Sequence, residues 1–310
     1  MKLDGRAIAD QLYTDLTKRV LKLQRKKITP HLVVFLIGNN PASVAYVTLK
    51  QKKADLIGAK VTILRFEESV LTEELRQKVL LLNQDPFVHG ILIQRPLPKH
   101  IDEKQLELAT APQKDVDGFH PESPFVLPLA PAVVKILEEV YTQKQGVTRA
   151  GDPRRAPGTN DVSEAVGRGS ERQAPDGFLM WLKTQKIVII GKGPSGGGPI
   201  ISYLKQLGIT PEIVDSKTKD PYTLTKQADV IIAAVGKHRV ITADNIRKGV
   251  ILIGVGVDKN DQGNLFGDYE EEEIADLAGF YTPTPGGTGP VNVAMLMDNL
   301  ITAAEKQTLK

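Results

Sequence analysis

Short, uninterrupted apolar runs that alternate with amphipathic stretches constrain the fold of this chain most. Residues 32–37 read Leu-Val-Val-Phe-Leu-Ile, without a polar side chain, which is typical of a parallel strand buried on both faces. Strand-like runs follow at 60–66 and 88–94, with helical patterns between them. Strand, helix, strand, helix, strand predicts a parallel α/β sheet.

The helix expected after the first run has clear start and stop signals. Asn40 can cap its N-terminus, Pro41 suits its first turn, and Gly58 can end it. The sequence therefore predicts a helix over 41–57.

The same alternation restarts near residue 186 and predicts a second, Rossmann-like α/β domain with a parallel sheet. The apolar run 186–190 enters a glycine loop, and a helix is expected at about 200–207. The further strands are expected at 212–214, 229–235 and 250–253. We expect two α/β domains flanking a cleft: residues 1–142, joined by a C-terminal helix over 290–308, and residues 178–289.

Residues 143–177 fit neither half. These 35 residues contain six glycines, three prolines and five of the 13 arginines, but no Leu, Ile, Phe, Met, Trp or Tyr. Such a segment buries too little apolar surface to offset its ordering entropy, which favours a loosely packed or disordered insertion. An arginine-rich binding arm is the alternative, although five acidic residues nearly cancel its charge.

Composition excludes several classes of function. The 40 basic and 37 acidic residues give a net charge of +3, which argues against a nucleic-acid partner. The absence of cysteine excludes disulfides, thiolate metal sites and a cysteine nucleophile. No apolar run approaches the ~18 residues of a membrane helix, and the N-terminus lacks a signal-peptide core. We expect a cytoplasmic protein without membrane contact.

A glycine loop suggests a dinucleotide site. Gly191-Lys192-Gly193-Pro194-Ser195-Gly196 matches G-x-G-x-x-G between a predicted strand and helix, where backbone N–H groups can bind a pyrophosphate. A glycine-rich turn without a ligand is the alternative. Asp215, 19 residues beyond Gly196, favours NAD because an acid there binds the ribose 2′-hydroxyl. Lys192 and Lys217 favour NADP, since either can meet a 2′-phosphate, so this pattern leaves the choice open.

Tyr46 and Lys50 are four residues apart and project from one face of the first predicted helix. An aromatic ring beside an amine suits a flat, conjugated substrate. Lys52 and Lys53 are expected to lower the pKa of Lys50 by like-charge repulsion, which would help it transfer protons. The same residues are also typical of a solvated helix face.

Three other segments carry polar groups or unusual backbone. Gln94 ends a predicted strand, where ligands of parallel sheets bind, or is simply a polar strand end. Asp115 and Asp117 lie in a turn-prone loop, where they either bind the N–H groups of a heterocycle or form an Asx-turn. The Pro/Gly-rich run 282–290 precedes a predicted helix and is expected to expose N–H groups to a ligand. The histidines lack metal-ligand spacing, and we expect no metal.

In order and spacing, four of these motifs resemble the methylenetetrahydrofolate dehydrogenase/cyclohydrolase family. They are Tyr46-x-x-x-Lys50, the segment 91–98, Lys114-Asp115-Val116-Asp117-Gly118-Phe119-His120-Pro121, and Pro285-Gly286-Gly287-Thr288-Gly289-Pro290. The resemblance covers nearly the whole chain except 143–177. It implies a homodimeric, NADP-linked oxidoreductase and hydrolase that interconverts tetrahydrofolate derivatives in one-carbon metabolism and supplies purine biosynthesis.

The resemblance also implies roles for individual residues. Tyr46 would stack on the folate, Lys50 would be essential for interconverting methenyl- and 10-formyl-tetrahydrofolate, and Gln94 would set the protonation of Lys50. Asp117 would anchor the pterin, and Gly289 and Pro290 would line the same pocket. The cofactor would lie against a set of residues in the second domain, namely Gly191, Lys192, Gly193, Ser195, Gly196, Asp215, Ser216 and Lys217.

The sequence departs from the family pattern near the cofactor and at the cleft edge. Lys192 stands where an arginine is frequent, Gly193 replaces a serine, and Asp215 precedes Ser216 where a histidine is frequent. Asn292 replaces a usual threonine, and Pro128-Leu129-Ala130-Pro131 replaces a motif that contains cysteine and threonine.

These departures leave an NAD-linked enzyme as an alternative, whereas the folate residues match the family. A dehydrogenase without cyclohydrolase activity is a second alternative, against which the intact Tyr46, Lys50 and Gln94 argue. A non-catalytic folate- or nucleotide-binding protein is the third, and the insertion 143–177 is the main argument for it.

Overall fold

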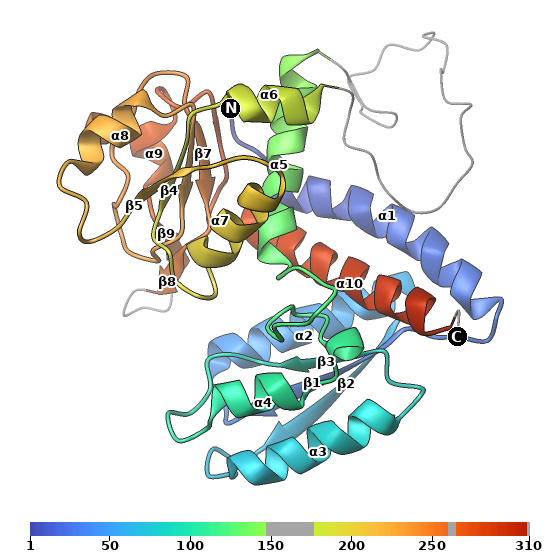
Figure 1. Cartoon of the computed structure of the whole chain (residues 1–310). Coiled ribbons are helices and arrows are strands. Elements are labelled where there is room, and N and C mark those ends of the chain that lie inside the picture. Colours follow the sequence, from blue (N-terminus) through green and yellow to red (C-terminus); the bar gives the residue numbers. More distant parts are fainter. Residues whose placement is uncertain (147–176, 260–264, 309–310) are drawn as a thin grey trace, which may run out of the picture.

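Two α/β lobes joined by long helices make up the computed structural model, which describes residues 1–146, 177–259 and 265–308 (Figure 1). The first lobe has a three-stranded parallel sheet of order β2-β1-β3, and the second has a five-stranded parallel sheet of order β10-β7-β6-β4-β5. The predicted fold class is confirmed. Apart from its two ends, the predicted insertion lies outside the described residues.

The first lobe alternates strands and helices as the apolar runs predict. Its elements are β1 (His31–Ile37), α2 (Pro41–Ile57), β2 (Lys60–Phe66), α3 (Thr72–Gln84), β3 (Gly90–Ile93), α4 (Glu103–Ala109) and η1 (Pro112–Lys114). Strand β1 is buried on both faces: Leu32 and Val34 join the core under α2, whereas Val33 and Phe35 join the core under α3 and α4. The continuous apolar run therefore serves two cores at once.

The second lobe is the Rossmann-like one. Its elements are α6 (Phe178–Thr184), β4 (Ile187–Ile190), α7 (Gly197–Gln206), β5 (Glu212–Val214), α8 (Pro221–Gln227), β6 (Val230–Ala233), η2 (Ala243–Asn245), β7 (Ile251–Gly254), β8 (Val257–Lys259), β9 (Leu265–Gly267), α9 (Glu271–Ile274) and β10 (Phe280–Tyr281). Strands β8 and β9 form a separate antiparallel pair.

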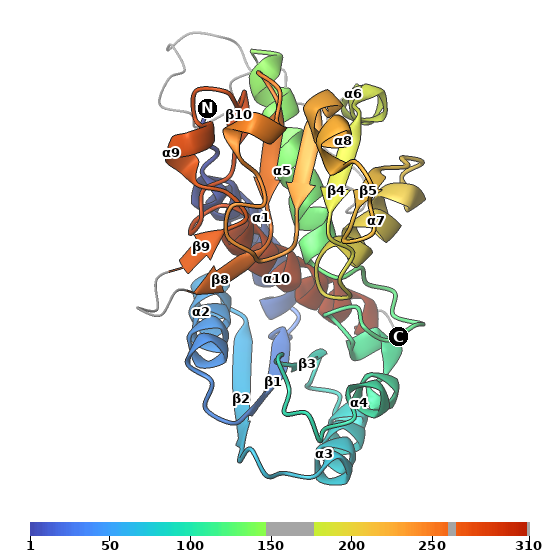
Figure 2. The same cartoon turned by 90° about the vertical axis from the view of Figure 1, so that its left-hand side faces the viewer.

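Three helices lie between the two sheets (Figures 1 and 2). They are α1 (Gly5–Gln24), α5 (Leu129–Lys144) and α10 (Thr288–Gln307). Arg19 of α1 binds Glu305 of α10 at 2.7 Å and also pairs with Asp298. One hydrophobic cluster extends from β1 through these helices to β4 and β6, so the lobes share a core.

Several predicted boundaries differ from the observed ones. Helix α5 continues to Lys144 and so includes the first two residues of the predicted insertion, and α7 begins at Gly197 rather than near residue 200. The third strand spans only Gly90–Ile93, although the N–H groups of the flanking His89 and Gln94 still donate to the carbonyls of His31 and Phe35 in β1. No helix in the described part of the chain is long and apolar enough to cross a membrane.

Candidate active site

Helix α2 carries Tyr46 and Lys50, and its ends are formed as predicted. The Asn40 side chain accepts hydrogen bonds from the N–H groups of Ala42 and Ser43 at 3.0 and 3.1 Å, and Gly58 ends the helix at a φ of 79°. Tyr46 and Lys50 face the interior rather than solvent, and Lys50 is only 5% exposed. The solvated-face alternative is therefore wrong for Lys50.

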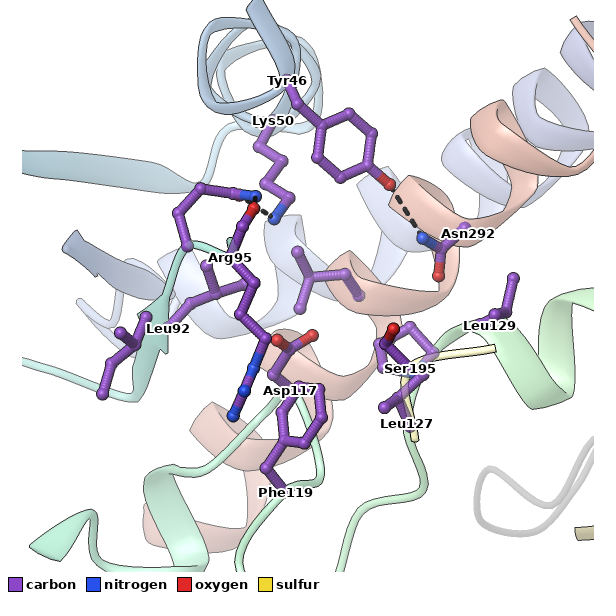
Figure 3. Close-up of a pocket in the computed structure, with 14 residues that line it drawn as sticks. Tyr46, Lys50, Leu92, Arg95, Asp117, Phe119, Leu127, Leu129, Ser195 and Asn292 are labelled. Atoms are coloured by element: carbon purple, nitrogen blue, oxygen red, sulfur yellow. Dashed lines mark hydrogen bonds between the residues drawn. The ribbon is translucent and has the colours of Figure 1, made fainter. Parts of the chain in front are cut away.

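A cavity of about 140 Å³ lies where the first lobe meets the joining helices and the glycine loop of the second lobe (Figure 3). Its lining brings together residues that are far apart in the sequence. They are Tyr46, Lys50, Leu92, Ile93, Gln94, Arg95, Asp117, Phe119, Leu127, Pro128, Leu129, Ser195, Asn292 and Leu296. All four predicted catalytic residues and one predicted cofactor residue, Ser195, are among them.

The Lys50 amine is held in a fixed direction. Its Nζ donates to Gln94 Oε1 at 2.9 Å and lies 4.6 Å from the centre of the Tyr46 ring. Gln94 follows β3 directly, and its Nε2 donates to the carbonyl of Arg95 at 2.6 Å. Because both ends of the Gln94 amide are engaged, its oxygen must face Lys50.

Burial governs the electrostatics of the cavity. It lowers the pKa of Lys50 to about 8, and the nearby Asp117 carboxylate only partly opposes this shift. Burial also raises the pKa of Asp117, against the effect of Lys50 and Arg95. The predicted cause of the Lys50 shift, repulsion by Lys52 and Lys53, is wrong.

Asp115 and Asp117 have different surroundings. Asp115 is buried and accepts hydrogen bonds from the N–H groups of Gly118 and His120 at 3.1 and 2.7 Å, so it forms the Asx-type turn of this loop. Asp117 instead lines the cavity. Among residues 1–146, 177–259 and 265–308, no group of three His, Asp or Glu side chains is placed to hold a metal ion.

Two polar cavity residues were not assigned a role from the sequence. The Arg95 guanidinium lies 4.0 Å from the centre of the Phe119 ring and pairs with Glu103 and Glu107, which fixes it at the cavity wall. Asn292 of α10 donates through Nδ2 to the Tyr46 hydroxyl at 2.8 Å (Figure 3). Arg95 follows an apolar strand, and this position could have indicated a role in the site from the sequence.

The glycine loop between β4 and α7 has the geometry of a phosphate-binding turn. Gly191 has a φ of +90°, and a Cβ on Gly197 would lie 1.9 Å from the Gly191 carbonyl oxygen, so both positions require glycine. A Cβ on Gly193 would meet nothing within 4 Å, and the loop is therefore open on that side. These features fit the close approach of a pyrophosphate to the N-terminus of α7.

Comparison with known proteins agrees with this geometry. The family model for the tetrahydrofolate dehydrogenase/cyclohydrolase catalytic domain matches residues 3–117, and the model for its NAD(P)-binding domain matches 179–308. The chain belongs to this family. The bifunctional protein FolD of Acidovorax sp. is 36% identical over 304 residues, covering 98% of both chains.

Solved structures of the family have the same fold over the whole chain. The bifunctional FolD methylenetetrahydrofolate dehydrogenase/cyclohydrolase of Campylobacter jejuni aligns with a TM-score of 0.82 and 31% identity over 99% of each chain. The Trypanosoma brucei enzyme, solved with NADP and an inhibitor, aligns with a TM-score of 0.79 and 26% identity, covering 100% of this chain and 99% of that one.

The other predicted cofactor residues of this family member lie outside the cavity. Lys192, Asp215, Ser216 and Lys217 are grouped at the carboxyl ends of β4 and β5, and Lys192 Nζ lies 2.7 Å from Asp215 Oδ2. Gly196 immediately precedes α7.

The Pro/Gly-rich run of this family member is largely packed against the N-terminus. A Cβ on Gly5 would lie 1.8 Å from the Gly287 carbonyl oxygen, and the Thr288 hydroxyl donates to the Gly254 carbonyl at 2.6 Å. Gly289 and Pro290, in the first turn of α10, do not line the cavity, although the space beside Gly289 is open. Much of this loop therefore joins the lobes.

A buried carboxylate that sequence reasoning missed shapes the loop after β6. Asp268 is fully buried and accepts hydrogen bonds from the N–H groups of Gly236, Lys237 and Gly256 at 2.7, 3.1 and 3.0 Å. Burial raises its pKa, and the three bonds oppose that shift. No sequence motif distinguishes this aspartate from its acidic neighbours.

Proposed function

We propose that the chain oxidises 5,10-methylenetetrahydrofolate to 5,10-methenyltetrahydrofolate with NADP and hydrolyses the product to 10-formyltetrahydrofolate. The observation that carries this is the buried Lys50 amine, fixed 2.9 Å from Gln94 inside a cavity that also contains Tyr46 and Asp117. The FolD relatives, which are named as bifunctional, support it. A cytoplasmic location, a homodimer and a link to purine biosynthesis stay predictions.

The cavity suits the flat, polar head of a folate. The Tyr46 ring offers a stacking face, and leucine side chains supply apolar surface elsewhere on the wall. Asp117 provides carboxylate oxygens that can accept hydrogen bonds from the N–H groups of a pterin. We assign Tyr46 and Asp117 to substrate binding, whereas the folate-binding role implied for Gly289 and Pro290 stays a prediction.

The glycine loop fits NADP, since it is open at Gly193 and precedes the N-terminus of α7. Gly191, Gly193 and Gly196 would let the backbone approach the pyrophosphate, while Lys192, Ser216 and Lys217 would hold the adenosine ribose. When bound, the nicotinamide accepts a hydride from the methylene carbon of the folate. Ser195 belongs to this loop and also lines the cavity, so it joins the two sites.

The hydrolytic step needs a group that takes a proton from water at neutral pH. With a pKa of about 8, a useful fraction of Lys50 is neutral and can accept that proton while the water oxygen bonds to the methenyl carbon. Gln94 keeps the amine directed at the cavity. The bond from this carbon to N5 then breaks, N5 takes the hydroxyl proton, and 10-formyltetrahydrofolate forms with net release of one proton.

Replacement of Lys50 tests the proposal. Lys50→Met keeps the aliphatic chain but removes the amine, so we expect methenyltetrahydrofolate hydrolysis to fall about 100-fold. The wild-type hydrolysis rate should rise as the pH approaches 8, because only the neutral amine accepts a proton, and this rise should disappear in the variant. The measurement is the loss of methenyl absorbance, corrected for the uncatalysed reaction.

Lys52→Met is the matched control, because it removes an exposed amine from the same helix. It should hydrolyse at the wild-type rate. Full hydrolysis by Lys50→Met would sink the assignment of Lys50. Binding of folate and NADP by the wild-type protein without turnover would instead favour the non-catalytic alternative.

A further inference from the structure

An ion pair lies at the edge of the sheet where β4 and β5 end. Strands β4 and β5 are parallel neighbours, with Ile190 opposite Val214, so their carboxyl ends meet at one edge of the sheet. Lys192 follows β4 and Asp215 follows β5, and their side chains meet at 2.7 Å. An acid after this second strand is the group that meets the ribose 2′-position in dinucleotide-binding folds.

The two partners differ in their freedom to move. Asp215 Oδ1 accepts hydrogen bonds from the Lys217 N–H at 2.9 Å and the Thr218 hydroxyl at 3.3 Å, and the Asp215 N–H donates to the same hydroxyl at 2.9 Å. Its side chain is 22% exposed, whereas that of Lys192 is 62% exposed. The carboxylate is therefore fixed by its turn, and the lysine is the partner that can move.

We propose that Asp215 determines the choice between NAD and NADP by competing with the 2′-phosphate for the Lys192 ammonium. This rests on the cofactor site assigned under Proposed function. A 2′-hydroxyl can donate to the free lone pairs of the carboxylate while Lys192 stays in place. A 2′-phosphate must instead draw Lys192 away and lie beside a like charge.

In the wild-type chain, the attraction of Lys192 to Asp215 and its attraction to a 2′-phosphate are close in strength. Solvent-exposed ion pairs are weak, so a phosphate with about two negative charges can break the Lys192–Asp215 contact. Among the described residues Lys217 has no ion-pair partner, and its ammonium is free to meet the phosphate as well. We therefore expect the wild-type protein to bind both cofactors, with NADP affinity held below what two lysines would otherwise provide.

Titration calorimetry with two fragments isolates the 2′-phosphate. 5′-AMP and 2′,5′-ADP differ only in that group, and both can be titrated into the intact protein at one ionic strength. Asp215→Asn keeps an oxygen for the Lys217 N–H but removes the charge. It should raise the affinity for 2′,5′-ADP about tenfold, the size expected from losing one nearby charge, and change that for 5′-AMP less than about threefold.

Two further variants complete the test. Asp276→Asn removes an exposed charge after α9, on the far side of the sheet from β5, and should leave both affinities unchanged. In Asp215→Asn/Lys192→Gln, most of the gain in 2′,5′-ADP affinity that Asp215→Asn produces should vanish when it is measured against the Lys192→Gln background. Turnover with NAD and with NADP should follow the fragment affinities.

Each contrary outcome has a distinct meaning. If both fragments bind the wild-type protein but Asp215→Asn leaves their ratio unchanged, Asp215 does not set the preference. If the full gain persists without Lys192, competition for that lysine is wrong. If neither fragment binds the wild-type protein, the cofactor site itself is wrong and this inference falls with it.

Discussion

The properties of the Lys50 amine come from its neighbours rather than from its type. Burial lowers its pKa to about 8, and the Gln94 oxygen at 2.9 Å fixes its direction without adding a charge. A carboxylate in place of Gln94 would stabilise the ammonium and raise the pKa again. A neutral acceptor therefore orients the lysine and still allows it to lose its proton near neutral pH.

The hydrogen bond between Asn292 and Tyr46 can be tested by removing each partner. In the wild-type protein Asn292 Nδ2 binds the Tyr46 hydroxyl at 2.8 Å, while the buried Asn292 Oδ1 has no partner among the described residues. Tyr46→Phe leaves both polar atoms of the amide unpaired, which should cost about 1–3 kcal/mol. Asn292→Ala removes the unpaired oxygen together with the donor and should cost less.

Urea unfolding of both variants and of the double variant measures this difference as a coupling energy. We expect a coupling of about 1 kcal/mol and a rise in KM for folate in Asn292→Ala, because the Tyr46 ring loses its anchor to α10. A coupling near zero, or a larger loss of stability in Asn292→Ala than in Tyr46→Phe, would contradict the role assigned to this bond.

At the scale of elements, sequence patterns predicted some strands and helices closely and missed others. The apolar runs located β1, β2, β4 and β5 to within a residue. For β1 and β4 this follows from burial on both faces, which leaves few polar positions. Helix α1 was not assigned, although Ile8, Leu12, Leu16 and Val20 recur every four residues and are all buried. That signal was present, but it indicates only an apolar stripe and not the partner on which the stripe packs.

The sequence predicted the residues of the candidate site that belong to recognisable motifs, but not their surroundings. Tyr46, Lys50, Gln94 and Asp117 were named from local patterns and a family resemblance, and the fold places all four in one cavity. The cause of the Lys50 pKa shift could not be predicted, because burial depends on contacts that no local window contains. Asp268 was missed for the same reason, since its three backbone partners come from other loops.

The edge between β1 and β3 should make folding sensitive to mild acid. The Nδ1 of His89 accepts a hydrogen bond from the His31 N–H at 3.2 Å, and burial lowers the pKa of His89 to about 4. Because the folded state prefers the neutral ring, its contribution is complete above pH 6.5 and is lost as the pH falls toward 4. We expect unfolding in urea to show a loss of about 2 kcal/mol between pH 7.5 and pH 5.

His89→Gln should flatten this dependence, whatever its stability at pH 7.5. Part of the slope should remain, since burial and Lys60 also lower the pKa of His31. His100→Gln, which removes an exposed imidazole, is the control and should keep the wild-type slope. An equal slope in wild type and His89→Gln would rule out this histidine as the source.

At the scale of the whole molecule, one hydrophobic core joins the two lobes. The cluster that includes Val34 of β1 and Ile189 of β4 passes through Leu137 of α5 and Leu300 of α10. The cavity opens where these helices meet the glycine loop, so its two walls come from different lobes. A change that separated α5 from its neighbours should therefore affect the site before it unfolds either sheet.

Aromatic contacts join the C-terminal part of α5 to α6. The Tyr141 ring lies 5.9 Å from that of Phe178 and 5.4 Å from that of Trp181, and its hydroxyl would be 2.7 Å from a Cβ on Gly177. We therefore predict that residues 147–176 can be replaced by a four-residue Gly/Ser linker. Both activities should stay within about twofold and the Tm within about 3 °C, because a short flexible loop costs little to close. Assays of both activities and calorimetry check this, and Tyr141→Ala in the same background should lower the Tm by weakening the aromatic contacts that hold the ends together. Loss of either activity with an unchanged Tm would show instead that the replaced residues act on the site, since the core between the lobes would then be intact.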